Sequence, residues 1–131
     1  MIVLDTHAWM WWAGEPERLS PAARRALVET LGKSPVFISA ISCWEVAMLS
    51  AKGRVNLGLP IRDWITRALQ GAGLSLAPLD PETAILSTSL PGAPPSDPSD
   101  QIILATALKH GAALVTKDEE LRRYGKVRTI W

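Results

Sequence analysis

The chain has 131 residues, of which 47% are hydrophobic and 21% are charged, a composition typical of a globular protein that is large enough to bury one core. Fourteen Lys and Arg residues against 13 Asp and Glu residues leave a net charge of +1, which excludes a strongly basic protein that coats nucleic acid. The single cysteine, Cys43, excludes an internal disulfide and a thiolate zinc site. We therefore expect one domain over residues 1–131, located in the cytoplasm, with no signal peptide and no membrane association.

Short hydrophobic runs alternate along the chain with segments whose apolar residues recur at helical spacing. A capping residue followed by proline stands at the helix starts at Ser20 and at Asp97. Ser42 and Glu45 have the spacing of a capping box, so we expect a helix to begin at Ser42. In chain order we predict a strand at 2–4, helices at 6–13 and 21–31, a strand at 36–39, helices at 42–52 and 60–69, a strand at 74–79, helices at 81–89 and 98–110, a strand at 113–116, a helix at 118–124 and a strand at 127–130.

This alternation predicts a layered α/β fold with a mainly parallel sheet. In such a fold, the carboxyl ends of the strands and the starts of the following helices share one edge, where ligands bind. Acidic residues stand at four of these positions: Asp5, Glu45, Asp100 and Asp118. We call these residues the four acids, and we expect them to converge at this edge.

Each acid taken alone is also explained as a helix cap or as a carboxylate that favours a helix dipole. Capping does not explain why all of them fall at the ligand-binding edge. Two carboxylates ~5 Å apart repel each other by about 3 kcal/mol at an effective dielectric constant of ~20, whereas a helix N-terminus recovers only ~1 kcal/mol. The cluster therefore needs protons or a divalent cation, and oxygen ligands favour Mg²⁺ or Mn²⁺ over zinc.

Four segments, taken in order, resemble the successive motifs of PIN-domain ribonucleases, and specifically of VapC-type toxins from type II toxin–antitoxin pairs. They are IVLDTHAW at residues 2–9, ISAISCWEVA at 38–47, DPSDQIILATA at 97–107 and LVTKD at 114–118. The resemblance covers essentially the whole chain, and four ordered motifs are far more specific than one. It implies a single PIN domain with a three-layer α/β/α fold around a central, mainly parallel sheet.

The resemblance also implies that the four acids are catalytic and bind one or two Mg²⁺ or Mn²⁺ ions. The ions would activate water and stabilise the charge that develops on the scissile phosphate, so that hydrolysis leaves a 5′-phosphate and a 3′-hydroxyl. Thr6 and Thr116 are candidates for orienting carboxylates or water. Asp97 lies one turn before Asp100 and is the alternative third ligand; we favour Asp100, because it stands where the family's acid precedes an ILATA run.

The implied partners are an RNA substrate, a cognate antitoxin that covers the acids, and a second copy of the chain in a homodimer. The alternative is a non-catalytic PIN-like module that binds RNA or protein. A phosphoryl-transfer domain is disfavoured, because no Asp-x-Asp pattern follows the first strand and no glycine-rich phosphate loop is present.

Lys117 lies between two motif residues and is our candidate RNA contact. We expect His7 to be structural rather than catalytic. Trp11 points off the predicted apolar face of its helix, which makes it the best candidate for a partner surface. Four other tryptophans occupy apolar helix positions, which favours the core or a protein interface over stacking on nucleobases: Trp9, Trp12, Trp44 and Trp64.

Overall fold

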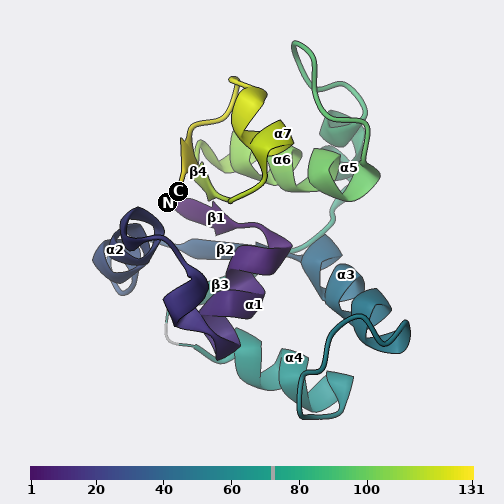
Figure 1. Ribbon diagram of the computed structural model, residues 1–131. Coiled ribbons are helices and arrows are strands. Elements are labelled where there is room, and N and C mark those ends of the chain that lie inside the picture. Colours follow the sequence, from purple (N-terminus) through teal and green to yellow (C-terminus); the bar gives the residue numbers. More distant parts are fainter. Residues whose placement is uncertain (72) are drawn as a thin grey trace.

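The computed structural model describes residues 1–71 and 73–131 of the chain. Within these residues, five strands form one parallel sheet in the order β3-β2-β1-β4-β5 (Figure 1). The strands are β1 (Ile2–Leu4), β2 (Val36–Ser39), β3 (Leu74–Ala77), β4 (Ala113–Val115) and β5 (Thr129–Ile130). The helices are α1 (Thr6–Gly14), α2 (Pro21–Thr30), α3 (Ala40–Ala51), α4 (Ile61–Leu69), α5 (Pro81–Ser87), α6 (Pro98–His110) and α7 (Glu119–Arg123), with a short 3₁₀ helix, η1 (Pro16–Arg18), after α1.

The three central strands, β1, β2 and β4, are almost entirely hydrophobic because both faces of the sheet are covered there. Successive side chains of a strand point to opposite faces, and in β1 this places Leu4 in one core and Val3 in the other. Leu4 is in register with Ile38 on β2 and with Val115 on β4. All of these side chains are completely buried, as expected for a parallel sheet between two helical layers.

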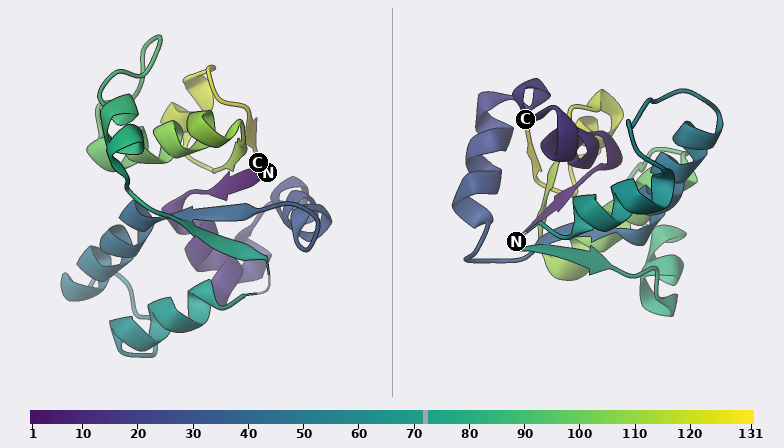
Figure 2. Two further views of the ribbon diagram at one scale, coloured as in Figure 1. Left: turned by 180° about the vertical axis from the view of Figure 1, so that it is seen from behind. Right: turned by 90° about the horizontal axis from the view of Figure 1, so that it is seen from below.

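The predicted three-layer α/β/α fold is therefore confirmed. Helices α1, α2 and α4 pack on the face that contains Leu4, around the buried Trp9 and Leu27. Helices α6 and α7 pack on the other face, through Ile103 and Leu121. Figure 1 shows these two groups on opposite sides of the sheet, and the view from behind in Figure 2 shows the same division.

Helix α3 follows β2 without a connecting loop and contacts α1 on one side and α6 on the other. It begins at Ala40, because Ser39 at the end of β2 caps it by accepting a hydrogen bond from Ile41 N at 3.3 Å. The predicted start at a Ser42 capping box is therefore wrong. Ser42 lies inside the helix and is completely buried.

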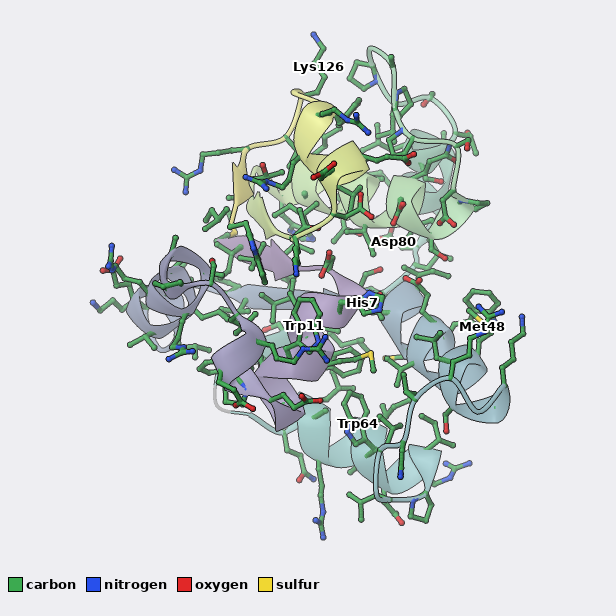
Figure 3. All side chains as sticks on the ribbon, viewed as in Figure 1. His7, Trp11, Met48, Trp64, Asp80 and Lys126 are labelled. Atoms are coloured by element: carbon green, nitrogen blue, oxygen red, sulfur yellow. The ribbon has the colours of Figure 1, made fainter. Side chains whose placement is uncertain are left out.

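The other predicted elements exist with somewhat different ends, and the last strand is the shortest, at Thr129–Ile130. Helix α5 lies beside α6 and is capped by Asp80, which is labelled in Figure 3. Lys109 Nζ, from α6, lies 2.5 Å from Asp80 Oδ2. No helix in the described part of the chain is long and apolar enough to cross a membrane.

Candidate active site

A cleft of about 520 Å³ opens at the carboxyl edge of the sheet, and all four acids line it. They come from the end of β1, from α3, from the first turn of α6 and from the start of α7. Asp97 and Lys117 also line the cleft. The structure thus brings together the residues that the parallel topology predicts to meet, although they are far apart in the sequence.

Asp5 is held at both carboxylate oxygens. Its Oδ1 accepts a hydrogen bond from Ala8 N at 2.8 Å, which caps α1, and the Thr116 hydroxyl donates to its Oδ2. Thr116 directly follows β4, the neighbour of β1, and its hydroxyl also accepts a hydrogen bond from Asp118 N at 3.0 Å. The buried Thr116 therefore positions both the backbone of Asp118 and the carboxylate of Asp5.

Glu45 is held by a second threonine. Thr6 Oγ1 lies 2.6 Å from Glu45 Oε1 and 2.9 Å from Ser42 Oγ. Because Thr6 has one hydroxyl hydrogen and an ionised carboxylate has none, Thr6 donates to Glu45 and accepts from Ser42. Sequence reasoning missed this role of Ser42, since its spacing from Glu45 is also that of a capping box.

Asp97 and Asp100 differ in their roles at the start of α6. Asp97 is the N-cap and accepts a hydrogen bond from Asp100 N at 3.0 Å, and its side chain is exposed. Asp100 is half-buried and has no side-chain partner of this kind among the described residues. Asp118 caps α7 in the same way as Asp97 caps α6, by accepting from Leu121 N at 3.1 Å.

The cluster is electrostatically strained. Burial, together with the charges of Asp97 and the three other acids, raises the pKa of Asp100 to about 7. Burial also raises the pKa of Asp5 and Glu45, against the hydrogen bonds from Thr116 and Thr6. Among the described residues none of the four acids forms an ion pair. The cleft therefore favours either protons or an added cation.

The donor set of the cleft consists of carboxylate oxygens, which suits hard cations such as Mg²⁺ or Mn²⁺. In the part of the chain that the structure describes, no three His, Cys, Asp or Glu side chains converge closely enough to hold an ion. Carboxylates repel one another where no cation is bound, which opposes a closer approach. The chemistry of these residues fits such a cation. To bind it, the carboxylates would have to move closer together.

His7 lies at the rim of the cleft rather than in the core. Figure 3 shows it at the start of α1, on the side of that helix that faces α3. It is exposed, and its ring is tilted against that of Trp11, with the ring centroids 5.8 Å apart. The sequence could have indicated this location, because His7 directly follows Asp5 and Thr6.

The burial of the tryptophans differs in part from the prediction. Trp9 and Trp64 are buried and pack edge to face, 5.1 Å apart. Trp11 is half-buried between Trp131 and the Arg18 guanidinium, so it offers less free surface than expected. Trp44 lies outside the core and is 56% exposed.

Fold and cleft together define an α/β protein with a carboxylate-rich site at the carboxyl edge of its sheet. The model of the PIN domain family matches residues 2–127, and the chain belongs to the PIN domain family. Ribonuclease VapC22 from Mycobacterium tuberculosis is 36% identical to it over 132 residues, which cover 99% of this chain and 98% of that protein.

Solved structures share the fold at lower identity. VapBC2 from Rickettsia felis, bound to a promoter DNA fragment, has a TM-score of 0.68 at 16% identity and covers 98% of this chain and 97% of that one. FitAcB from Neisseria gonorrhoeae has a TM-score of 0.63 at 23% identity and covers 98% of this chain and 96% of that one. M. tuberculosis VapC20, a toxin that cleaves the sarcin-ricin loop, has a TM-score of 0.65 at 14% identity. The match covers 98% of this chain and 99% of that one.

Proposed function

We propose that this chain is an endoribonuclease that depends on Mg²⁺ or Mn²⁺ and acts as the toxin of a type II toxin–antitoxin pair. The observation that carries the proposal is the single cleft lined by all four acids, in a chain that is 36% identical to a ribonuclease over nearly its whole length. An acidic cleft repels the RNA backbone, and this repulsion is overcome where the acids hold a cation.

The four acids would hold one or two divalent ions. A bound divalent ion supplies a Lewis acid and positive charge for the attack of water on a phosphodiester. Asp100, whose pKa is raised to about 7, would hold such an ion in its deprotonated form. Thr116 and Thr6 fix the orientation of Asp5 and Glu45, which lowers the cost of bringing the carboxylates together.

Hydrolysis adds water to the scissile phosphorus and breaks its bond to the 3′ oxygen, which takes up a proton. The products carry a 5′-phosphate and a 3′-hydroxyl. Lys117 is exposed at the cleft between Thr116 and Asp118, a position from which its ammonium group can contact a phosphate of the bound strand.

The proposal extends to partners and organisation. Solved relatives of this fold include toxin–antitoxin complexes, one of them from Klebsiella pneumoniae, which supports a cognate antitoxin that covers the cleft with a basic side chain. We further propose one PIN domain over residues 1–131, a homodimer, and a location in the cytoplasm, where RNA targets occur. The strands β1 to β5 all belong to one sheet, which supports a single domain for these residues.

The test is cleavage of single-stranded RNA by the purified chain with Mg²⁺ or Mn²⁺ and with EDTA. We expect cleavage with either metal, no cleavage in EDTA, and ligation of an adaptor to the new 5′-phosphate ends. Asp5→Asn, purified identically, controls for contaminating nucleases and should be inactive. Wild-type protein should also gain thermal stability with Mn²⁺ in excess of the gain seen for Asp5→Asn.

Cleavage that persists in EDTA would contradict the metal dependence. RNA binding without cleavage under every metal condition would identify the non-catalytic PIN-like module instead.

A further inference from the structure

The segment between α5 and α6 leads directly to the acids at the start of α6. Residues 91–97 have the sequence PGAPPSD, and we call them the proline segment. Figure 1 shows it within the loop that joins α5 to α6, on the same side of the sheet as α7. Proline fixes φ at about −65°, so Pro91, Pro94 and Pro95 restrict the backbone of this segment. Its position therefore depends mainly on how its two ends are held.

The start of the proline segment is held by residues that follow α7. The buried Tyr124 donates a hydrogen bond from its hydroxyl to the Pro91 carbonyl oxygen over 2.5 Å. Gly92 has a φ of +74°, and a Cβ atom there would lie 3.1 Å from Cε of Lys126, which is labelled in Figure 3. Because Asp118 caps α7, this end of the segment is tied to the helix that begins at one of the four acids.

The other end of the proline segment is held by Gln101. Its side-chain amide donates from Nε2 to the Pro95 carbonyl oxygen over 2.9 Å. Its backbone N–H donates to the Asp97 carbonyl oxygen over 3.0 Å. Gln101 directly follows Asp100 in the sequence, so it joins the first turn of α6 to the segment that precedes this turn.

The first turn of α6 needs such a contact, because the core holds it only in part. Ile103 and Leu104 are almost completely buried and fix the body of the helix, whereas Asp100 and Gln101 are half-buried. Asp97 and the three other acids repel an ionised Asp100, which favours movement of this turn away from the cleft. The Asp97 cap contributes to that repulsion. Gln101 is uncharged, so it holds the turn without adding to it.

We propose that Gln101 and Tyr124 are positioning residues for Asp100. By holding the two ends of the proline segment, they keep the first turn of α6 at the place from which the Asp100 carboxylate reaches a divalent cation. The inference rests on the proposed metal-dependent function and adds two residues to it, neither of which lines the acidic cleft.

The first experiment measures the affinity of the purified chain for Mn²⁺ by calorimetric titration. Gln101→Met keeps the length of the side chain and removes its donor. We expect the affinity to fall about 10-fold, within the usual effect of losing a group that orients a metal ligand. Tyr124→Phe removes only a hydroxyl and should lower the affinity by a smaller factor, because Pro91 is farther than Pro95 from Asp100 along the chain.

The matched control is Thr106→Val, because Thr106 also donates from α6 to a backbone carbonyl oxygen, that of Ile102, at 2.8 Å. This variant loses a hydrogen bond of the same kind in the same helix and leaves the proline segment intact. A purely structural role of Gln101 predicts the same Mn²⁺ affinity for both variants. We expect Thr106→Val to bind Mn²⁺ as the wild type does.

Two further measurements separate positioning from stability. In the metal-free protein, Gln101→Met should accelerate hydrogen exchange at the Asp100 amide, which donates to the Asp97 carboxylate. In cleavage assays, the Mn²⁺ concentration for half-maximal rate should rise about 10-fold, in proportion to the loss of affinity. The KM for RNA at saturating Mn²⁺ should not change, because the RNA contacts are intact.

An unchanged Mn²⁺ affinity in either Gln101→Met or Tyr124→Phe would overturn the proposal. An equal loss in Thr106→Val, or an unchanged exchange rate at the Asp100 amide of Gln101→Met, would also overturn it. Failure of the proposed function is distinguishable, because it appears in the wild type: a wild-type chain that binds no Mn²⁺ contradicts that function and this inference together.

Discussion

The Thr6 hydroxyl donates to the Glu45 carboxylate over 2.6 Å and thereby joins the first turn of α1 to the middle of α3. Ser42, one turn before Glu45, donates in turn to Thr6. This chain of three side chains fixes the distance between the helix that follows β1 and the helix that follows β2. The positions of Asp5 and Glu45 relative to each other depend on it.

Thr6→Val keeps the shape of this buried side chain and removes its hydroxyl. We expect affinity for Mn²⁺ to fall about 10- to 100-fold, the usual effect of losing a group that orients a metal ligand. The free energy of unfolding should fall by about 1–2 kcal/mol, since Ser42 loses its acceptor. Calorimetric titration and urea denaturation measure the two effects. Thr6→Ser should retain both properties, and an unchanged Mn²⁺ affinity in Thr6→Val would show that Glu45 needs no such support.

The pKa of Asp100 sets the sign of a pH dependence in the metal-free protein. This carboxyl titrates at its ordinary value of 3.8 in the unfolded chain and at about 7 in the folded chain. Between these values the folded state binds more protons, so the free energy of unfolding decreases as the pH rises. After allowance for solvent screening, we expect a loss of roughly 1–2 kcal/mol between pH 4 and pH 8 from this group.

Asp100→Asn should remove that part of the pH dependence, as measured by urea denaturation in EDTA at several pH values. A further decrease remains, because burial also raises the pKa values of Asp5 and Glu45. If the variant and the wild type lose stability in parallel, Asp100 is not the residue that holds the proton.

Asp97→Asn and Asp100→Asn distinguish the two acids at the start of α6. Asparagine caps a helix as well as aspartate does, so Asp97→Asn should keep the hydrogen bond to Asp100 N and the fold. We expect this variant to cleave RNA within about 10-fold of the wild-type rate, while Asp100→Asn loses at least about 100-fold, as for a residue of the catalytic constellation. The reverse order of rates would make Asp97 the metal ligand.

Lys117→Ala tests the contact with the RNA backbone. The loss of one phosphate contact should reduce the slope of log Kd against log salt concentration by about 0.7 for a single strand. It should weaken binding of all sequences to the same extent. Lys33→Ala, at an exposed lysine near the opposite edge of the sheet, is the control. A slope equal to that of the wild type would exclude Lys117 from the RNA path.

The fold and the four acids could be predicted because they depend on short-range patterns and on one topological rule. Parallel strands end at a common edge, so Asp5 and Asp118 are brought to the same cleft by the alternation of strands and helices alone. The helix cap at Asp97 was also visible in the sequence. In the structure both Asp97 and Asp118 cap a helix, and both line the cleft.

Contacts between side chains of distant segments were not predictable in this way. Thr6 and Ser42 are 36 positions apart, and nothing local to Ser42 distinguishes a buried link from a helix cap. The apolar position of Trp44 in its helix predicted a place in the core or in a protein interface. The inward face of α3 is set by packing against α1 and α6, and the spacing of apolar residues within one helix does not contain that information.

The hydrogen bond from Thr116 to Asp5 joins residues 111 positions apart, and it exists only where β4 has paired with β1. Because β4 is the neighbour of β1 in the sheet, Asp5 gains this contact only after residues 113–116 have been synthesised and paired. In the proposed toxin, a fragment that ends before Thr116 lacks both this contact and Asp118, so it cannot bring the four acids together. Such a fragment of the proposed toxin would therefore be inactive before any inhibitor binds.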